Sequence, residues 1–483
     1  MLENIPEYLF LFGGAALAGA VVVGINPTRR GAERAADIEH TDCQVVLTDE
    51  RRDELTGVAG TEVVDVTAPP WAERVGAAPD SIEGFEPVDA STLFLLIFTS
   101  GSTGTPKAVK CSQGRLARAG AMGFGADAVL YCSMPLFHGN ALWSNWMPAI
   151  GSGATVVLKR RFSASTFLPD IREHGVTFVN TVGRALAYVL ATPPSEHDRD
   201  HSLKVVMAPE SSARDIAAFR ERFGCFVMEG YGSSEGAIQL APGRRSPPGS
   251  LGRPVGDADL AVIDRDTMRE CPPAVMDANG VLLNPDEAIG ELVRRDAGSL
   301  FEGYYRNDEA EAERTRNGWF WSGDLVYRDE AGELFFAGRS GDWLRVDGEN
   351  FAAAPVERIL GRYEPLAGVA VYAVPDPRTG DRVMAALELA GDARLDLEAF
   401  QRFVDAQPDL GTKWAPSFVR VVDALPVTAT SKLDKQPLRR ARWDGGEVWW
   451  RPDRTGPWEA VTGDVAARLR KDFAEHGRSH LLS

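Results

Sequence analysis

The nine residues from Thr99 to Lys107 combine the side chains that a phosphate-binding loop needs. They read Thr-Ser-Gly-Ser-Thr-Gly-Thr-Pro-Lys, with two glycines, five hydroxyl side chains and one lysine. Glycines let backbone N–H groups approach an anion, hydroxyls add donors, and Lys107 supplies positive charge. The stretch is not a Walker-type loop, because Thr105 and Pro106 separate Gly104 from Lys107. A flexible surface loop of the same composition is the alternative interpretation.

A second polar stretch, residues 230–236, reads Gly-Tyr-Gly-Ser-Ser-Glu-Gly and offers groups that a nucleotide could contact. Tyr231 presents a flat face to adenine. Ser234 can donate to a phosphate oxygen, and Glu235 can hold Mg²⁺, which prefers oxygen ligands. In isolation the stretch could equally be a tight turn with an exposed glutamate. The phosphate loop upstream favours the nucleotide interpretation.

The first stretch resembles the phosphate loop of the adenylate-forming superfamily, which includes acyl-CoA synthetases, luciferases and peptide-synthetase adenylation domains. The second resembles that superfamily's Tyr-Gly-x-Thr/Ser-Glu motif, and further motifs follow in the superfamily's order along essentially the whole chain. Residues 162–165, 184–191 and 448–452 resemble the fatty-acid-transport-protein-like branch of long-chain and very-long-chain acyl-CoA synthetases of actinobacterial type.

The resemblance implies a catalytic lysine, a metal ligand and a nucleotide site. Residues 425–432 resemble the motif Leu-Pro-x-Thr-x-x-Gly/Phe-Lys, which selects Lys432, although Ser431 departs from it and Lys435 is the runner-up. Lys432 would neutralise charge on the α-phosphate, and Glu235 would be a catalytic residue that binds Mg²⁺. The implied nucleotide-binding residues are Thr99, Ser100, Gly101, Ser102, Thr103, Gly104, Lys107, Glu210, Tyr231, Gly232, Ser234, Asp324 and Arg339.

His138 is the third predicted catalytic residue, and it occupies the position where the superfamily lines the carboxylate end of the acid site. Peptide-synthetase domains carry Phe-Asp there, whereas this chain has Phe137-His138, so the substrate need not be an amino acid. A buried structural histidine is the alternative. The residues that we expect to line the acyl pocket, for each of which core packing is an equal alternative, are Trp143, Val179, Val182 and Gly183.

The resemblance also implies two domains and a rotation between the two half-reactions. We expect an AMP-binding domain over residues 1–340 and a small C-terminal domain with the catalytic lysine over residues 341–483. The hinge of the superfamily falls on Gly341, and glycine tolerates large changes of φ and ψ. Gly348 and Glu349 match the loop that contacts CoA.

The predicted elements indicate an α/β fold. A buried strand at 92–98 precedes the phosphate loop, and further strands alternate with helical stretches, which is typical of parallel sheets. We expect a large N-terminal domain of parallel-sheet α/β subdomains plus a β-rich subdomain, and a small mobile α+β C-terminal domain. The polar region 49–88 is predicted to connect elements. The other predicted strands are 154–158, 176–179, 204–208, 226–228, 260–263, 290–293, 369–374 and 383–389.

The apolar run from Leu9 to Ile25 is predicted to be a helix and a strand, because four glycines interrupt it and its start is acidic. It is therefore interpreted neither as a membrane span nor as a signal peptide. The superfamily normally has several dozen residues before this point. We expect that the start codon was assigned too far downstream, with a missing N-terminal piece as the alternative.

The net charge and the cysteine content limit the classes of partner and the cellular compartment that we expect. The net charge is −17, which argues against nucleic acid and against adsorption to anionic lipid, while peripheral membrane contact and a homodimer stay open. The five scattered cysteines fit packed thiols in a reducing compartment, so we expect a cytoplasmic protein without a zinc site.

The sequence therefore predicts an AMP-forming acid–thiol ligase that uses ATP, Mg²⁺ and CoA. It would convert a long-chain, very-long-chain or steroid side-chain carboxylic acid to an acyl-adenylate and then to acyl-CoA, releasing pyrophosphate and AMP. One alternative is an acid-activating enzyme that hands the acyl group to a carrier protein. Another is a catalytically impaired homologue that binds acyl groups or nucleotides.

Overall fold

The structure is a computed structural model of the 483-residue chain. It describes all residues except 28–30, 50–54, 56–59, 80–86, 100–106, 122, 210, 212, 244, 248, 278–281, 297–299, 340–342, 347–348, 379, 392, 409, 412, 429–431, 453–455 and 483, and only the backbone at 213, 339, 343, 345, 349, 350 and 352. The chain forms two compact units. Unit 1 comprises Met1–Pro248, Pro254–Ala258 and Arg294–Phe320, and unit 2 comprises Gly249–Arg253, Asp259–Val293 and Trp321–Ser483.

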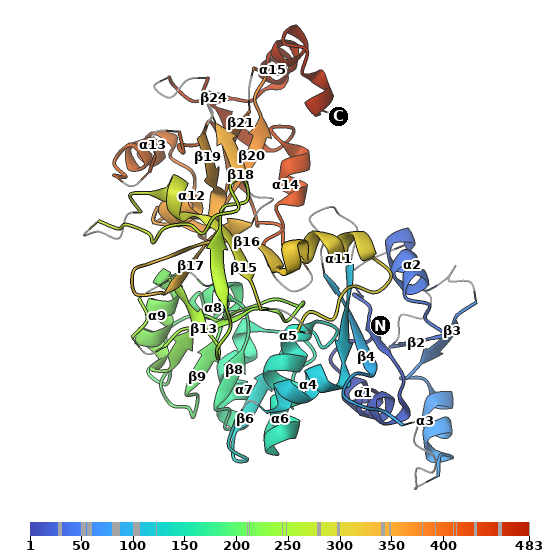
Figure 1. The fold of residues 1–483 in the computed structure, drawn as a ribbon. Helices are drawn as coiled ribbons and strands as arrows, with labels where there is room; N and C mark the ends of the chain where they lie inside the picture. The colour runs from blue at the N-terminus through green and yellow to red at the C-terminus, as the bar shows by residue number, and fades with distance from the viewer. Residues whose placement is uncertain are drawn as a thin grey trace. The chain divides into compact units, whose positions relative to one another are not determined.

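Unit 1 is built on a five-stranded parallel sheet and two smaller sheets (Figure 1). The order of the parallel sheet is β10-β9-β8-β6-β7, and a second sheet has the order β1-β4-β5, in which β4 and β5 are antiparallel. Strands β2 and β3 form a parallel pair, and β11 pairs with β12. The strands are β1 Val22–Gly24, β2 Val45–Thr48, β3 Glu62–Asp65, β4 Leu93–Thr99, β5 Lys107–Ser112, β6 Val129–Cys132, β7 Thr155–Leu158, β8 Phe178–Asn180, β9 Val205–Met207, β10 Phe226–Met228, β11 Tyr231–Gly232 and β12 Gln239–Ala241.

Helices α7, α8 and α9 pack against the parallel sheet and form the main core of unit 1. Phe167 and Phe219 from these helices contact the buried strand residues Val179 and Val206. Between α5 and α6 the chain makes a π-helical turn, Leu142–Trp146. The helices of unit 1 are α1 Pro6–Ala18, α2 Gly31–His40, α3 Pro69–Gly76, α4 Gln113–Gly120, α5 Gly139–Ala141, α6 Met147–Ser152, α7 Ala164–Glu173, α8 Gly183–Leu190, α9 Ala213–Phe223 and α11 Asp308–Arg314.

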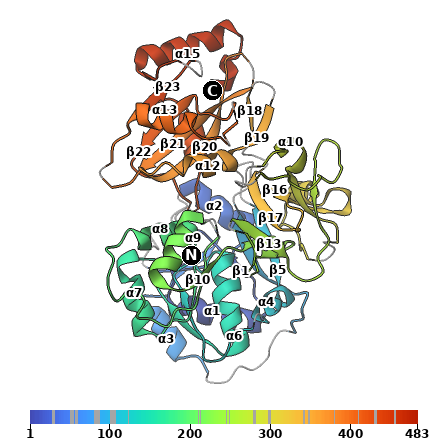
Figure 2. The same cartoon turned by 90° about the vertical axis from the view of Figure 1, so that its left-hand side faces the viewer.

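Unit 2 contains a five-stranded sheet of order β20-β21-β22-β23-β24 with helices on both faces (Figure 2). Alternate residues of a strand point to opposite faces, so Val371 packs with α12 and α13, whereas Tyr372 packs with α14 and α15. Its remaining strands run in the order β13-β17-β16-β15-β14, beside the hairpin β18-β19. The elements are β13 Ser250–Pro254, β14 Leu260–Ile263, α10 Pro285–Ala288, β15 Gly290–Arg294, β16 Phe320–Arg328, β17 Leu334–Arg339, β18 Trp343–Val346, β19 Glu349–Ala352, α12 Ala353–Leu360, β20 Leu366–Pro375, β21 Asp381–Leu389, α13 Leu397–Asp405, β22 Phe418–Val422, α14 Gln436–Ala441, β23 Glu447–Trp450, β24 Glu459–Ala460 and α15 Gly463–Glu475.

The predicted α/β class is confirmed, and most predicted strands are present. The run from Leu9 to Ile25 forms the end of α1 and β1, as expected, and no helix among the described residues is long and apolar enough to cross a membrane. The region 49–88 was wrongly predicted to be only a connection, because it contains β3 and α3. Strand β5 was also not predicted.

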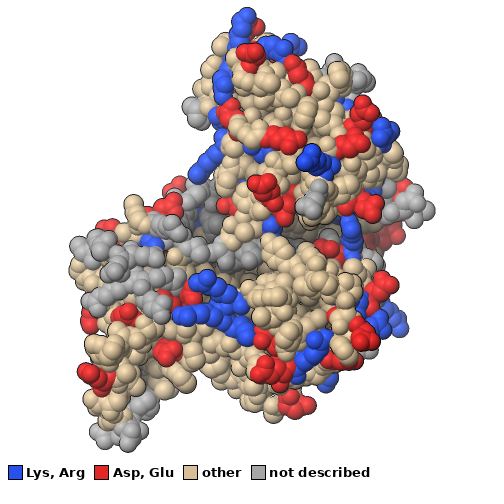
Figure 3. Space-filling view, turned by 180° about the vertical axis from the view of Figure 1, so that it is seen from behind, with Lys and Arg blue, Asp and Glu red and all other residues tan. Residues whose placement is uncertain are grey.

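The view from behind shows basic and acidic side chains interspersed on that face (Figure 3). Among the residues that the structure describes on this face, short groups of Lys and Arg lie among Asp and Glu.

Candidate active site

The predicted phosphate loop connects two antiparallel strands of unit 1. Thr99 ends β4 and lies opposite Lys107, the first residue of β5, in the strand register. The loop is therefore closed at its base by a strand pair, which holds its two ends together. The predicted nucleotide-binding residues Ser100, Gly101, Ser102, Thr103 and Gly104 lie outside the described residues.

Lys107 is buried at the base of this loop, with 7% of its side chain exposed. Its Nζ lies 3.3 Å from Oε2 of Glu313 in α11, and 5.6 Å from the centre of the Tyr304 ring. A buried ammonium group is stabilised by a carboxylate and by the face of an aromatic ring. The loop lysine therefore has a fixed position with two partners that were not predicted.

Glu235 lies in a turn that follows the hairpin strand β11. The turn is closed by the N–H of Gly236, which donates to the carbonyl of Ser233 at 3.0 Å, and Gly236 has a φ of 73°, which favours glycine. Glu235 itself is 7% exposed. Its Oε1 accepts a hydrogen bond from Oη of Tyr304 at 2.8 Å. The alternative of an exposed glutamate on a turn is wrong.

Arg115 of α4 connects the Glu235 turn to a predicted residue of the acyl pocket. Its guanidinium group is buried, donates to the carbonyl of Ser234, and lies 5.2 Å from the centre of the Trp143 ring. A side chain at Gly139 would collide with Trp143, and one at Gly236 would collide with Arg115. The two glycines thus make room for a stacked Trp143–Arg115 pair.

His138 follows β6 and caps the short helix α5. Its Nδ1 accepts from the backbone N–H of Asn140 at 3.4 Å, so in the neutral ring the proton is on Nε2. Val179 is completely buried in the core under α7, α8 and α9, and Val182 and Gly183 are buried at the start of α8. Their roles in an acyl pocket stay predictions.

The predicted ribose residues lie on neighbouring strands of unit 2. Asp324 of β16 is directly opposite Arg339 of β17 in the antiparallel register, and the N–H of Asp324 donates to Oγ of Ser322 at 3.0 Å. Only the backbone of Arg339 and of Glu349, a predicted CoA contact, is described. Glu210, the predicted hinge residue Gly341 and the predicted CoA contact Gly348 lie outside the described residues.

The two candidate lysines near the C-terminus have different surroundings. Lys432 is half-buried, its carbonyl accepts from the N–H of Thr428 at 2.7 Å, and its N–H donates to Oγ1 of Thr428 at 3.3 Å. Lys435 instead forms an ion pair with Glu357 of α12 at 2.8 Å, and both side chains are mostly buried. Glu357 also accepts from the N–H of Val371 at 2.7 Å. This pairing supports a structural role for Lys435.

The carboxylate of Glu235 suits a Mg²⁺ ion that arrives with the nucleotide, not one held entirely by protein side chains. Among the residues that the structure describes, no three or more His, Cys, Asp or Glu side chains form a group that could hold a metal. Mg²⁺ that accompanies a nucleotide needs only one or two carboxylates together with phosphate oxygens and water. A single buried carboxylate near the loop lysine meets that requirement.

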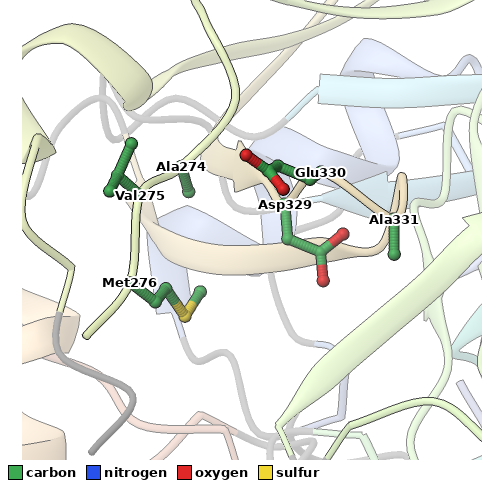
Figure 4. Close-up of a pocket in the computed structure, with 6 residues that line it drawn as sticks. All are labelled: Ala274, Val275, Met276, Asp329, Glu330 and Ala331. Carbon is green, nitrogen blue, oxygen red and sulfur yellow. The ribbon is translucent and has the colours of Figure 1, made fainter. Parts of the chain in front are cut away.

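Unit 2 has a surface depression, and the described residues that line it include none of the predicted site residues (Figure 4). Its volume is about 370 Å³, and it lies between the segment Ala274–Met276 and the turn Asp329–Ala331. Its rim carries the carboxylates of Asp329 and Glu330, which would repel phosphate groups. We therefore do not assign it to the nucleotide.

The cysteines offer no nucleophile for covalent catalysis. All five are free thiols, and four of them are buried. Burial raises the pKa of Cys111, which lies on β5 near the phosphate loop, to about 11. Because the thiolate is the reactive form, this cysteine stays protonated at neutral pH.

Sequence reasoning missed the residues that hold the predicted ones in place. Tyr304, Arg115 and Glu313 contact Glu235, Ser234 and Lys107 across 69 to 206 residues of sequence. The segment that begins Gly303-Tyr304-Tyr305 also resembles a segment of the superfamily, and this resemblance is the signal that the sequence offers for Tyr304.

The fold and the order of the motifs are those of an adenylate-forming enzyme, and comparison with known proteins agrees. The profile of the AMP-binding enzyme family matches residues 1–305, and that of the AMP-binding enzyme C-terminal domain matches residues 355–432. The chain therefore belongs to the AMP-binding enzyme family.

Two curated relatives and one solved structure are similar over most of their length. Steroid-22-oyl-CoA synthetase of Rhodococcus jostii is 49% identical over 100% of this chain and 89% of the relative. Medium/long-chain-fatty-acid–CoA ligase FadD17 of Mycobacterium tuberculosis is 46% identical over 91% and 85%. ATP-bound MatB from Rhodopseudomonas palustris has the same fold, with a TM-score of 0.81, 22% identity, and 92% and 88% coverage. The chain is an AMP-forming acid–CoA ligase, that is, an acyl-CoA synthetase that uses ATP and CoA.

Proposed function

We propose that the enzyme activates the carboxyl group of a steroid side-chain acid and joins it to CoA. The observation that carries this substrate class is the 49% identity to steroid-22-oyl-CoA synthetase over the whole chain. A medium- or long-chain fatty acid is the second candidate, favoured by the 46% identity to FadD17 of M. tuberculosis. The absence of an acidic residue in Phe137-His138 supports an uncharged apolar tail over an amino acid.

In the first half-reaction, a carboxylate oxygen of the acid attacks the α-phosphorus of ATP and the bond to pyrophosphate breaks. We assign Thr99–Gly104 and Lys107 to the β- and γ-phosphates, because the loop offers many donors and one cation. Tyr231 and Ser234, with Gly232 and Glu210, would contact adenine and phosphate. Mg²⁺ bound by Glu235 would neutralise phosphate charge during this step.

Lys432 is the residue we assign to the developing charge on the α-phosphate, since a preorganised cation lowers the barrier most where charge increases. Asp324 can accept hydrogen bonds from ribose hydroxyls, and Arg339 can reach ribose or the α-phosphate.

In the second half-reaction, the CoA sulfur attacks the acyl carbonyl carbon, AMP leaves, and the thiol proton is released. We propose that residues 341–483 turn as a small domain about Gly341, which removes Lys432 and brings Gly348 and Glu349 to the CoA. The acyl tail would lie along His138, Trp143, Val182 and Gly183, with Val179 behind them. The buried, free thiols support a reducing, cytoplasmic compartment.

Mass-spectrometric detection of acyl-CoA tests the proposal. The enzyme is incubated with MgATP, CoA and a panel of steroid side-chain, medium-chain, long-chain and very-long-chain acids. The expected result is a steroid side-chain thioester with the largest kcat/KM. A larger kcat/KM for straight-chain acids would favour the second candidate.

Two further outcomes separate the remaining alternatives. Acyl transfer only to a phosphopantetheinylated carrier protein, with none to free CoA, would identify a carrier-protein enzyme. ATP binding without release of pyrophosphate for any acid would identify an impaired homologue.

A further inference from the structure

Tyr304 is held on strand β5 by its own backbone and by its neighbours. It forms an antiparallel bridge with Val109, and its N–H donates to Oε2 of Glu311 at 3.1 Å. The next N–H, that of Tyr305, donates to the carbonyl of Ala108 at 2.7 Å. Because β5 is also the strand that leaves the phosphate loop, Tyr304 has a fixed position relative to the base of that loop.

The side chain of Tyr304 contacts both groups that a metal–nucleotide complex would need. It is 1% exposed. Its hydroxyl donates to Oε1 of Glu235 at 2.8 Å, and Nζ of Lys107 lies 5.6 Å from its ring centre. One buried side chain therefore touches the proposed metal ligand with its hydroxyl and the loop lysine with its ring.

Arg314 fixes the direction of the hydroxyl proton. Its Nε donates to Oη of Tyr304 at 3.3 Å, so that oxygen already accepts one hydrogen bond. A tyrosine hydroxyl has a single proton, and Glu235 is the acceptor in its path.

We infer that Tyr304 is a positioning residue that orients the Glu235 carboxylate for a divalent cation and holds Lys107 beside it. The inference rests on the proposed role of Glu235 as a metal ligand. With Oε1 engaged by Tyr304, Oε2 is the oxygen left for the cation. Mg²⁺ requires near-ideal octahedral geometry, and the outer partner of a metal ligand typically changes metal affinity by about 10- to 100-fold.

The test compares Tyr304→Phe with Tyr305→Phe. Each substitution removes one hydroxyl from adjacent tyrosines, but Oη of Tyr305 bonds Oδ2 of Asp42 at an exposed position, 3.2 Å away. Binding of Mn²⁺ in the presence of ATP is measured by electron paramagnetic resonance, which needs no turnover. We expect Tyr304→Phe to weaken Mn²⁺ binding about tenfold and Tyr305→Phe to leave it within about twofold.

A double-mutant cycle with Glu235→Gln decides whether the effect passes through Glu235. We expect Tyr304→Phe to have almost no further effect on Mn²⁺ binding in the Glu235→Gln background. An equal loss in both backgrounds, or wild-type affinity in folded Tyr304→Phe, would overturn the inference. Thermal unfolding checks the fold, and if Tyr304→Phe does not fold, Arg314→Met carries the same test, with unchanged affinity as the contradicting result.

The binding measurement also separates this inference from the proposed function. If the wild-type enzyme forms no thioester and releases no pyrophosphate, the proposed function fails, while Tyr304-dependent Mn²⁺ binding would still support the positioning role. If acids are converted rapidly but Tyr304→Phe binds Mn²⁺ as the wild type does, the function stands and the inference fails.

Discussion

Lys107 and Lys432 are the two lysines assigned to phosphate, and their surroundings differ in nearly every respect. Lys107 begins a buried strand, with 7% of its side chain exposed, an ion pair to Glu313 and the ring of Tyr304 below its ammonium group. Lys432 is half-buried, and two hydrogen bonds join it to Thr428. Lys107 is part of a sheet, whereas Lys432 lies outside the named strands and helices.

The difference suggests how one enzyme can perform two steps with the same nucleotide. A lysine on a paired strand keeps its place while a phosphate group arrives and leaves. A lysine that lies outside the sheets can be withdrawn with its segment, without breaking a ladder of strand hydrogen bonds. We therefore predict that Lys107, on its strand, serves ATP binding, and that Lys432, outside the sheets, serves one chemical step.

The largest expected effect is that of Lys432→Ala. We expect adenylate formation to fall by about 10²- to 10³-fold, because a charge that stabilises the transition state is lost. Thioester formation from supplied acyl-adenylate should stay near the wild-type rate, since we assign Lys432 to the first half-reaction alone. Single-turnover assays of each half-reaction measure both. Equal loss in the two half-reactions would remove the functional distinction between the lysines.

Lys107→Met should act mainly on ATP binding. We expect the KM for ATP to rise about tenfold, with a smaller change in kcat, because the lost charge contacts phosphate in the ground state as well as in the transition state. Steady-state kinetics over a range of ATP concentrations measure this change. A loss confined to kcat would show that the fixed lysine also serves the chemical step.

Lys435→Met separates stability from catalysis in the C-terminal segment. The substitution leaves Glu357 without its lysine partner at a site where both side chains are mostly buried. We expect the free energy of unfolding to fall by about 1–3 kcal/mol, while both half-reactions change by less than about threefold. Urea denaturation followed by fluorescence gives the stability. If adenylate formation instead fell as in Lys432→Ala, Lys435 would be the catalytic lysine.

Glu313→Gln is the smallest predicted change. Glu313 is 58% exposed, so its attraction for Lys107 is screened by solvent. Removing its charge should free Lys107 for phosphate and lower the KM for ATP by about twofold. Glu309→Gln, another acidic residue of α11, is the control and should leave the KM unchanged. A raised KM in Glu313→Gln would mean that Glu313 positions Lys107 productively.

The sequence predicted the elements whose signal is local. Strands β10 and β14 have the predicted bounds, because short apolar runs with β-branched residues lie between polar turns. Strand β3 reads Glu-Val-Val-Asp, so only two apolar residues stand between two charged ones, and the eight residues of α3 begin with two prolines and complete only about two helical turns. Strand β5 alternates small, apolar and polar residues, and its pairing with β4 across the loop makes it a strand.

The candidate site was also predictable only where its residues have a local sequence signal. Motifs identified Glu235, Lys107 and Lys432 because their spacing is short and resembles that of a known superfamily. Tyr304 and Arg115 act through contacts with residues far along the chain, which composition and spacing do not record. The supporting contacts of the site were therefore visible only once the chain was folded.

The packing of Arg115 on Trp143 restricts which substitutions this enzyme can accept during evolution. The space for the ring and the guanidinium group exists because residues 139 and 236 have no side chain. A change at one of these four positions would be tolerated only with a compensating change at another. In descendants of this sequence, Gly139, Trp143, Arg115 and Gly236 should therefore be inherited, or replaced, as a set.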